Sequence, residues 1–151
     1  MTPDSQPAIR GITPAEIPKL CELLRSASLP VDDISDLPQL RFWAAEQRGE
    51  IVGVVGLECI GQSAMLRSLA VVPAFRSQGL GRHLVEHVER HARDAGYRLL
   101  ALLTTSAERF FHGLGYSSIN RASVPEDVKQ TAQFRSLCPS SAVCMTKSLT
   151  Q

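Results

Sequence analysis

The sequence lacks the features that mark several classes of protein. No apolar run approaches about 18 residues, so we expect no membrane-spanning helix. The N-terminal stretch Met1 to Pro7 has no basic region followed by an apolar one, so we expect no signal peptide. The formal net charge is only +1, which gives no reason to expect a nucleic-acid or membrane partner.

Cysteine and lysine are also scarce. The four cysteines, Cys21, Cys59, Cys138 and Cys144, show no Cys-x-x-Cys spacing, and we expect reduced thiols in a cytoplasmic protein. Of the 16 basic residues only 3 are lysine. The excess of arginine suits recognition of carboxylates and phosphates, but a GC-rich genome explains it more simply.

What remains is an ordinary globular composition, with 44% hydrophobic and 21% charged residues in 151. This length predicts one domain, residues 1–151. Periodicity and turn residues predict an α+β fold with a mixed, mostly antiparallel sheet of six or seven strands and helices on both faces. We expect strands at 8–13, 40–46, 50–59, 64–72, 99–103, 116–119 and 142–149. We expect helices at 14–28, 80–95, 107–114 and 123–133. Segment 30–38 is expected to form a short helical turn or a mobile loop beside a substrate cleft.

The stretch Leu69 to Gly81 predicts an anion site. An apolar strand ends at Pro73, a loop follows, and an amphipathic helix begins near Leu80. The first backbone N–H groups of a helix have no intrahelical partner, and the helix dipole places partial positive charge there. Gly79 and Gly81 would let a phosphate approach the backbone.

Two common phosphate motifs do not fit this stretch. A dinucleotide-binding fingerprint needs a third glycine, but position 84 is Leu, and the stretch follows the fourth strand instead of the first. A P-loop needs Gly-Lys-Ser/Thr, which is absent.

The pattern Arg76-x-x-Gly79-x-Gly81, directly after Leu-x-Val and a proline, resembles the acetyl-coenzyme A signature of the GNAT acyltransferases. The element order fits this family, and Phe110 to Tyr116 resembles its late helix and turn. The resemblance implies a GNAT fold whose central strands splay apart at the acetyl-CoA site. It implies that the backbone of Leu69, Ala70 and Val71 pairs with the pantetheine arm, and that Thr104 and Phe111 border the cofactor. The cradle for the pyrophosphate would be made by Arg76, Ser77, Gln78, Gly79, Leu80, Gly81 and Arg82.

The expected catalytic acid is missing. In this family a tyrosine on the late helix protonates the departing thiolate, but the matching residue here is Phe111, and Thr104 stands where asparagine is frequent. His112 and Tyr116 are substitute acids, and water is a third solution because a thiol of pKa near 8.5 leaves readily.

The acceptor side depends on a few charged residues. A base must take a proton from the attacking amine, and Glu58 is the first candidate, with Glu46 second. Arg67 alternates with Leu69 along one strand, so both are expected on one face. An arginine in an apolar strand must be paired, so Arg67 binds either a substrate acid or a carboxylate such as Glu58. Ser68 and Arg135 are further candidate substrate ligands.

Three segments, 56–58, 66–71 and 134–142, resemble the acetyltransferases of arsenic-resistance gene clusters. This resemblance implies detoxification of a small amine, such as an amino-acid-like organoarsenical or phosphinic acid. The family also implies homodimers formed through an exposed last strand.

Two clusters could bind metal, and for each we favour a simpler role. His83, His87 and His91 have helical spacing that suits zinc, but no ligand completes the shell, so a solvated helix flank is favoured. Cys138 and Cys144 could bind a soft metalloid, but small buried side chains are favoured. We therefore predict no metal and an acetyl-CoA-dependent N-acetyltransferase acting on a small amine by direct attack. The alternative is a module that binds acetyl-CoA as a sensor without turnover.

Overall fold

The computed structural model describes residues 7–32, 34, 40–76, 78–132, 134–135 and 141–150. The strands are β1 (Ala8–Gly11), β2 (Leu40–Gln47), β3 (Glu50–Ile60), β4 (Ser63–Val71), β5 (Leu99–Thr104), β6 (Ser117–Ile119) and β7 (Val143–Ser148). The α-helices are α1 (Ile17–Ser26), α2 (Leu80–Asp94), α3 (Glu108–Gly113) and α4 (Glu126–Lys129). Single turns of 3-10 helix are η1 (Pro14–Glu16), η3 (Pro73–Phe75) and η4 (Arg121–Ser123). None of the described helices is long and apolar enough to cross a membrane.

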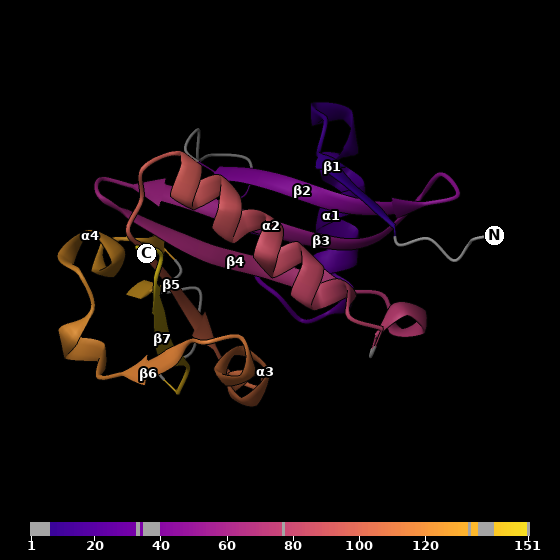
Figure 1. Ribbon diagram of the computed structural model, residues 1–151. Helices are drawn as coiled ribbons and strands as arrows, with labels where there is room; N and C mark the ends of the chain where they lie inside the picture. The colour runs from indigo at the N-terminus through magenta and orange to yellow at the C-terminus, as the bar shows by residue number, and fades with distance from the viewer. Residues whose placement is uncertain are drawn as a thin grey trace.

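These strands form one mixed sheet in the order β1-β2-β3-β4-β5-β7-β6. Among the described strands, only β4 and β5 run parallel, because α2 connects them as a crossover, and this confirms the predicted α+β architecture. Helix α2 lies across one face of β2–β4, while β5–β7 and α3 form a separate group beyond β4 (Figure 1). The last strand was expected to be exposed at an edge of the sheet. It is not an edge strand, because β7 pairs with both β5 and β6.

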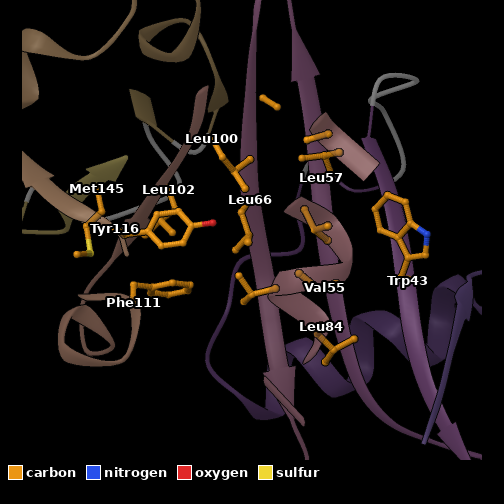
Figure 2. Packing of buried hydrophobic residues seen from close by; sticks show 14 of the residues in the cluster. Trp43, Val55, Leu57, Leu66, Leu84, Leu100, Leu102, Phe111, Tyr116 and Met145 are labelled. Carbon is orange, nitrogen blue, oxygen red and sulfur yellow. The ribbon is translucent and has the colours of Figure 1, made fainter. Parts of the chain in front are cut away.

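The sheet separates two apolar layers. The larger layer packs α2, through Leu84 and Val88, on the face that also carries Val55. In it, Leu66 of β4 lies between Tyr116 on one side and Val55 on the other (Figure 2). The smaller layer packs α1 against the opposite face, where Val54 and Ala70 are buried. The periodicity of α1 and α2 thus correctly predicted helices on both faces.

A bulge in β4 interrupts the regular pairing with β3. Val54 pairs with Ala70 and Gly56 pairs with Arg67, so β4 has one residue more than β3 between these pairs. Ser68 absorbs the extra residue in the left-handed region, at φ 58°. As a result Arg67 lies on the α1 face with Gly56, while Leu69 packs on the α2 face. The expectation that Arg67 and Leu69 share a face was therefore wrong.

The parallel pair β4–β5 is short. Its only pairs among the described residues are Ala64 with Leu100 and Met65 with Ala101. Beyond Met65, β4 continues to Val71 and β5 continues to Thr104 without pairing to each other. The strands therefore diverge where the family resemblance implied a splayed sheet.

Several helical expectations need correction. The predicted helix at 123–133 is divided between η4 and the four-residue α4. Just before the late helix α3, Thr104 Oγ1 accepts a hydrogen bond from the Ala107 N–H at 2.9 Å. Most of segment 30–38 lies outside the described residues.

The histidine flank of α2 is not simply solvated. The His87 and His91 rings pack edge-on against Trp43, with centroids 5.7 and 4.9 Å away. Burial lowers the pKa of His87, so this residue resists protonation.

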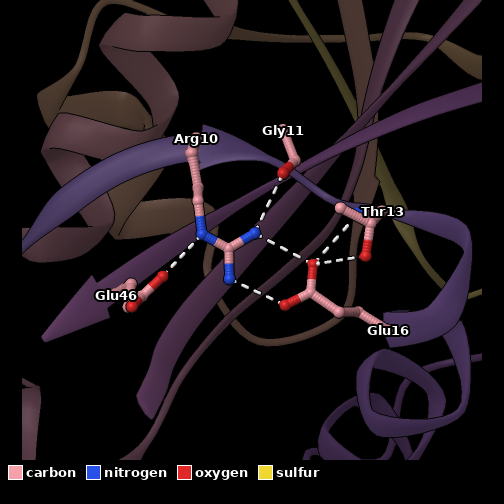
Figure 3. A network of polar contacts seen from close by, with 5 residues as sticks. All are labelled: Arg10, Gly11, Thr13, Glu16 and Glu46. Atoms are coloured by element: carbon pink, nitrogen blue, oxygen red, sulfur yellow. Dashed lines mark hydrogen bonds and ion pairs between the residues drawn. The ribbon is translucent and has the colours of Figure 1, made fainter. Parts of the chain in front are cut away.

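A polar network ties β1 to its neighbours (Figure 3). The Arg10 guanidinium donates to Glu46 Oε1 at 2.6 Å and to Glu16 Oε2 at 2.7 Å. Glu16 also accepts from the Thr13 N–H at 3.0 Å, as a capping box requires. These donors, Arg10 first, lower the pKa of Glu16 to about 2. Glu46, the second candidate base, is therefore held in an ion pair with Arg10 at the edge of the sheet formed by β1.

The close packing at the bulge explains why residue 56 is a glycine, and it leads to a prediction. A Cβ at Gly56 would lie 2.7 Å from Phe42 Cε1 and 3.3 Å from the Arg67 carbonyl oxygen. We expect Gly56→Ala to lower the free energy of unfolding by about 1–3 kcal/mol, because Phe42 is buried and must move. Urea denaturation measures this, with Gly11→Ala as the control, since a Cβ there meets nothing within 4 Å. Equal stability of the two variants would contradict the close packing at the bulge.

Candidate functional site

The divergence of β4 and β5 opens a cleft of about 500 Å³. One wall is β4 from Leu66 to Val71, and the other is formed by residues 102–107 and Phe111. Residues 27–30 after α1, together with Arg76 and Ala142, complete the lining. The volume is that of a small-molecule site.

The β4 wall offers backbone hydrogen-bonding groups. The Val72 N–H donates to the Val52 carbonyl of β3 at 3.0 Å, so the backbone groups of the preceding residue, Val71, face away from β3. Arg76 Nε donates to the Val71 carbonyl at 3.0 Å from that side. The edge is therefore open to an extended ligand that displaces the Arg76 contact.

The N-terminus of α2 adjoins this wall. Gly79 precedes the helix with φ 81°, and a Cβ there would approach nothing closer than His83 Cε1 at 3.8 Å. The space beside these backbone N–H groups is thus open, and the dipole of the 15-residue helix favours an anion. Leu80 is buried and anchors the first turn in the core.

Two further predicted cradle residues, Gln78 and Arg82, are exposed. The Gln78 amide donates to the Ala74 carbonyl at 3.1 Å, and Arg82 pairs with Glu86 at 3.2 Å. Both can contribute backbone N–H groups without moving their side chains. Ser77 lies outside the described residues.

Phe110 is an aromatic residue at this site to which the sequence analysis gave no role. Its side chain is 38% exposed, and it is the one exposed large hydrophobic residue in the described part of the chain. Phe110 Cζ lies 3.4 Å from the position of a Cβ on Gly81, so the ring covers the start of α2. The aromatic pair Phe110–Phe111 in the late-helix motif was the signal that could have identified it.

Arg67 and Glu58 form a buried ion pair at the cleft. Arg67 Nη1 donates to Glu58 Oε1 at 3.1 Å, and the two side chains are 1% and 3% exposed. Arg67 Nε also donates to Ser68 Oγ at 3.3 Å. Arg67 lines the cleft, whereas Glu58 does not. The structure thus realises one predicted alternative, pairing with Glu58, and leaves the other open, because Arg67 still borders the cleft.

Neither substitute acid lines the cleft. His112 is exposed in a shallow hollow that adjoins the cleft, because Thr105 and Ser106 line both. Tyr116 is 1% exposed, and its hydroxyl donates to Glu89 Oε2 at 2.9 Å. Burial, with the neighbouring Glu89, raises the pKa of Tyr116 far above its ordinary value, so the phenol keeps its proton.

Phe111 and Thr104, which were predicted to border the cofactor, line the cleft, whereas Arg135 is exposed and does not. Cys138 lies outside the described residues, and burial raises the pKa of the Cys144 thiol. Of the turn after α1, Pro30 belongs to the segment that was expected beside a substrate cleft, whereas residues 27–29 were given no role because their residue types carry no motif.

The sheet is split beside an open helix start, which is the architecture of the GNAT acetyltransferases. A family model described as an acetyltransferase (GNAT) domain matches residues 38–118, which is more than half of the chain. The chain belongs to the GNAT acetyltransferase domain family. It is an acetyl-CoA-dependent N-acetyltransferase of the GNAT type.

Curated relatives share this family. An uncharacterised N-acetyltransferase from Chlorobaculum tepidum is 29% identical over 138 residues, which is 91% of this chain and 83% of that protein. An amino-acid acetyltransferase from Pseudomonas syringae is 35% identical over 85 residues, which is 54% of this chain but only 20% of that enzyme.

Solved structures share the fold. N-acetylglutamate synthase from Neisseria gonorrhoeae, solved with coenzyme A and N-acetyl-glutamate, matches with a TM-score of 0.83 at 19% identity. The match covers 99% of this chain and 37% of that one. A GNAT-family acetyltransferase from Staphylococcus aureus matches with a TM-score of 0.79 at 19% identity, covering 95% of this chain and 99% of that one.

The helix start predicts the effect of adding a side chain. We expect Gly79→Glu to weaken coenzyme A binding about 100-fold or more, because a carboxylate would occupy the anion site. Calorimetry with coenzyme A measures this. Gly49→Glu is the matched control, because Gly49 has the same φ of 81° and lies in the β2–β3 turn. An equal loss in both variants, or unchanged affinity in Gly79→Glu, would contradict the placement.

Proposed function

We propose that the protein transfers an acetyl group from acetyl-CoA to the amine of a small molecule that also carries an acid group, such as an amino acid. The observation that carries this proposal is Arg67, a guanidinium with a side chain 1% exposed that nevertheless borders the cleft. Glu58 is already its ion-pair partner, and the planar donors of a guanidinium also suit the two oxygens of a substrate acid group. Glu58 balances the charge and orients the guanidinium from behind.

The donor side follows from the cleft wall and the helix start. Acetyl-CoA supplies an activated acyl thioester. The backbone N–H groups of residues 78–82 would hold its pyrophosphate, and Leu69 and Val71 would pair with its pantetheine arm, after Arg76 releases the Val71 carbonyl. The open space at Gly79 fits a phosphate.

Proton transfer in the cleft would pass through water. The described residues that line the cleft include no carboxylate and no histidine. The α-amino group of a free amino acid is mostly protonated near pH 7, so attack starts from the minor neutral fraction, which grows as the pH rises. The C–N bond forms, the C–S bond breaks, the amine loses a proton to water, and the thiolate takes one from water.

Glu58 and Phe111 then have roles other than those first expected. Glu58 pairs with Arg67 but does not line the cleft, so its role in this proposal is to orient Arg67 and not to act as the base. Phe111 is 4% exposed and gives the thioester an apolar wall that excludes water.

The similarity to an amino-acid acetyltransferase from Pseudomonas syringae supports an amino-acid-like acceptor. An amino-acid-like organoarsenical or phosphinic acid fits the same chemistry, because its acid group would bind Arg67 in the same way. The second candidate is a sensor that binds acetyl-CoA without turnover. Phe111, in place of a catalytic tyrosine, favours it.

A thiol-release assay separates these functions. We expect turnover with L-glutamate, L-glutamine or the amino-acid-like arsenical and phosphinic acid. For the corresponding esters, which lack the anion, we expect kcat/KM to be lower by about 10-fold or more. If coenzyme A raises the melting temperature but no amine is turned over, the sensor is correct. If coenzyme A causes no thermal shift, both functions are wrong.

The role of Glu58 can be tested by removing its charge. We expect Glu58→Gln to lower kcat/KM for acidic amines about 10- to 100-fold, because Arg67 loses its buried counter-charge. This loss should be equal at every pH between about 6.5 and 9, as an orienting role requires. A loss confined to pH values below the pKa of the amine would instead identify Glu58 as the base. Glu46→Gln is the control, since Glu46 pairs with Arg10 away from the cleft.

A further inference from the structure

A second charge cluster, in which Glu89 and Tyr116 are buried and Lys147 is half-buried, lies behind the cleft. Lys147 Nζ lies 3.2 and 3.1 Å from the two carboxylate oxygens of Glu89, and the Tyr116 hydroxyl donates to Glu89 at 2.9 Å. Glu89, on the 15-residue helix α2, is only 6% exposed. Two donors hold a buried carboxylate in one geometry. Removing either donor leaves part of the buried charge uncompensated, which is destabilising.

The three residues come from both sides of the split in the sheet. Glu89 belongs to α2, which packs on β2–β4, whereas Lys147 belongs to β7 and Tyr116 precedes β6. In the described sheet these two groups of strands are joined through only two residue pairs, Ala64–Leu100 and Met65–Ala101. The cluster therefore adds a charged bridge where backbone pairing is weakest.

The bridge reaches the cleft through aromatic packing. The Tyr116 and Phe111 rings pack edge to face, with centroids 5.5 Å apart, and Phe111 lines the cleft. Lys147 Nζ also donates to the Leu114 carbonyl at 2.8 Å, so it fixes the turn that follows α3. Gly115 passes close to Lys147 in this turn, with φ 99°.

We propose that Glu89, Lys147 and Tyr116 are positioning residues for acetyl transfer, which hold α3 and Phe111 at a fixed distance from the β4 wall. The inference rests on the proposed function, because Phe111 is taken to border the thioester. Arg93 Nε, which donates to the Leu149 carbonyl at 3.0 Å, adds a second tie from α2 to the end of β7. The cluster acts through the width of the cleft and touches no reacting atom.

Two variants and a matched control test this role. Tyr116→Phe removes one hydroxyl group, and Lys147→Met removes the charge while keeping the length of the side chain. Arg10→Met is the control, because it breaks ion pairs to Glu16 and Glu46 at β1, outside the cleft (Figure 3). We expect kcat for the best acceptor in the thiol-release panel to fall about 10-fold in both cluster variants. We expect the KM for that amine and the Kd for coenzyme A to change less than about threefold. The control should keep kcat at a similar loss of melting temperature.

Amide hydrogen exchange gives a readout that needs no turnover. The N–H groups of Phe111, Gly115 and Tyr116, which bond within α3 and its turn, should exchange about 10-fold faster in the cluster variants and not in Arg10→Met. Unchanged exchange at these amides, or an equal fall of kcat in the control, would overturn the proposal. If the wild-type protein acetylates no amine, the proposed function fails. Amide hydrogen exchange, measured together with the Kd for coenzyme A, still decides whether the cluster positions α3.

Discussion

The architecture of this protein depends on one extra residue in a strand. The bulge at Ser68 makes β4 one residue longer than β3 over the same span, and it reverses the alternation of side chains beyond it. Arg67 therefore faces α1, Leu69 faces α2, and the β4 edge separates from β5 after two residue pairs. The cleft, its open backbone edge and the buried arginine all follow from this local change in register, and the start of α2 supplies the adjoining anion site.

Two ion pairs of low exposure stabilise opposite sides of that cleft. Arg67 with Glu58 belongs to the acceptor side, and Glu89 with Lys147 lies behind the Phe111 wall. Pairs of this kind add little net stability, because desolvation offsets much of the attraction, but removing one partner leaves an uncompensated charge. Their value here is geometric: each fixes a group that borders the cleft, so the charged residues specify a shape that apolar packing alone would leave less defined.

The sequence was informative where a local rule decides the outcome. Helical periodicity predicted α2 within one residue of its observed end, and the glycine pattern at Gly79 and Gly81 identified the helix start and the family. Strict alternation failed at Arg67, because a bulge is decided by pairing with a distant strand. The burial of Glu89 cannot be predicted from helical periodicity, because its partners, Tyr116 and Lys147, are distant in sequence. His112 and Tyr116 were chosen by residue type, and only tertiary packing shows that neither lines the cleft.

The central claim is that the bulged edge of β4 and the start of α2 together form the donor site. A titration of the ¹⁵N-labelled protein with coenzyme A, followed by backbone amide chemical shifts, tests it most directly. The account predicts the largest shifts at Leu69 and Val71 and at the first turn of α2, including Gly79 and Gly81, with little change along α1 and β1. Saturable binding with its largest shifts away from the cleft, or with Leu69 and Val71 unaffected, would contradict it.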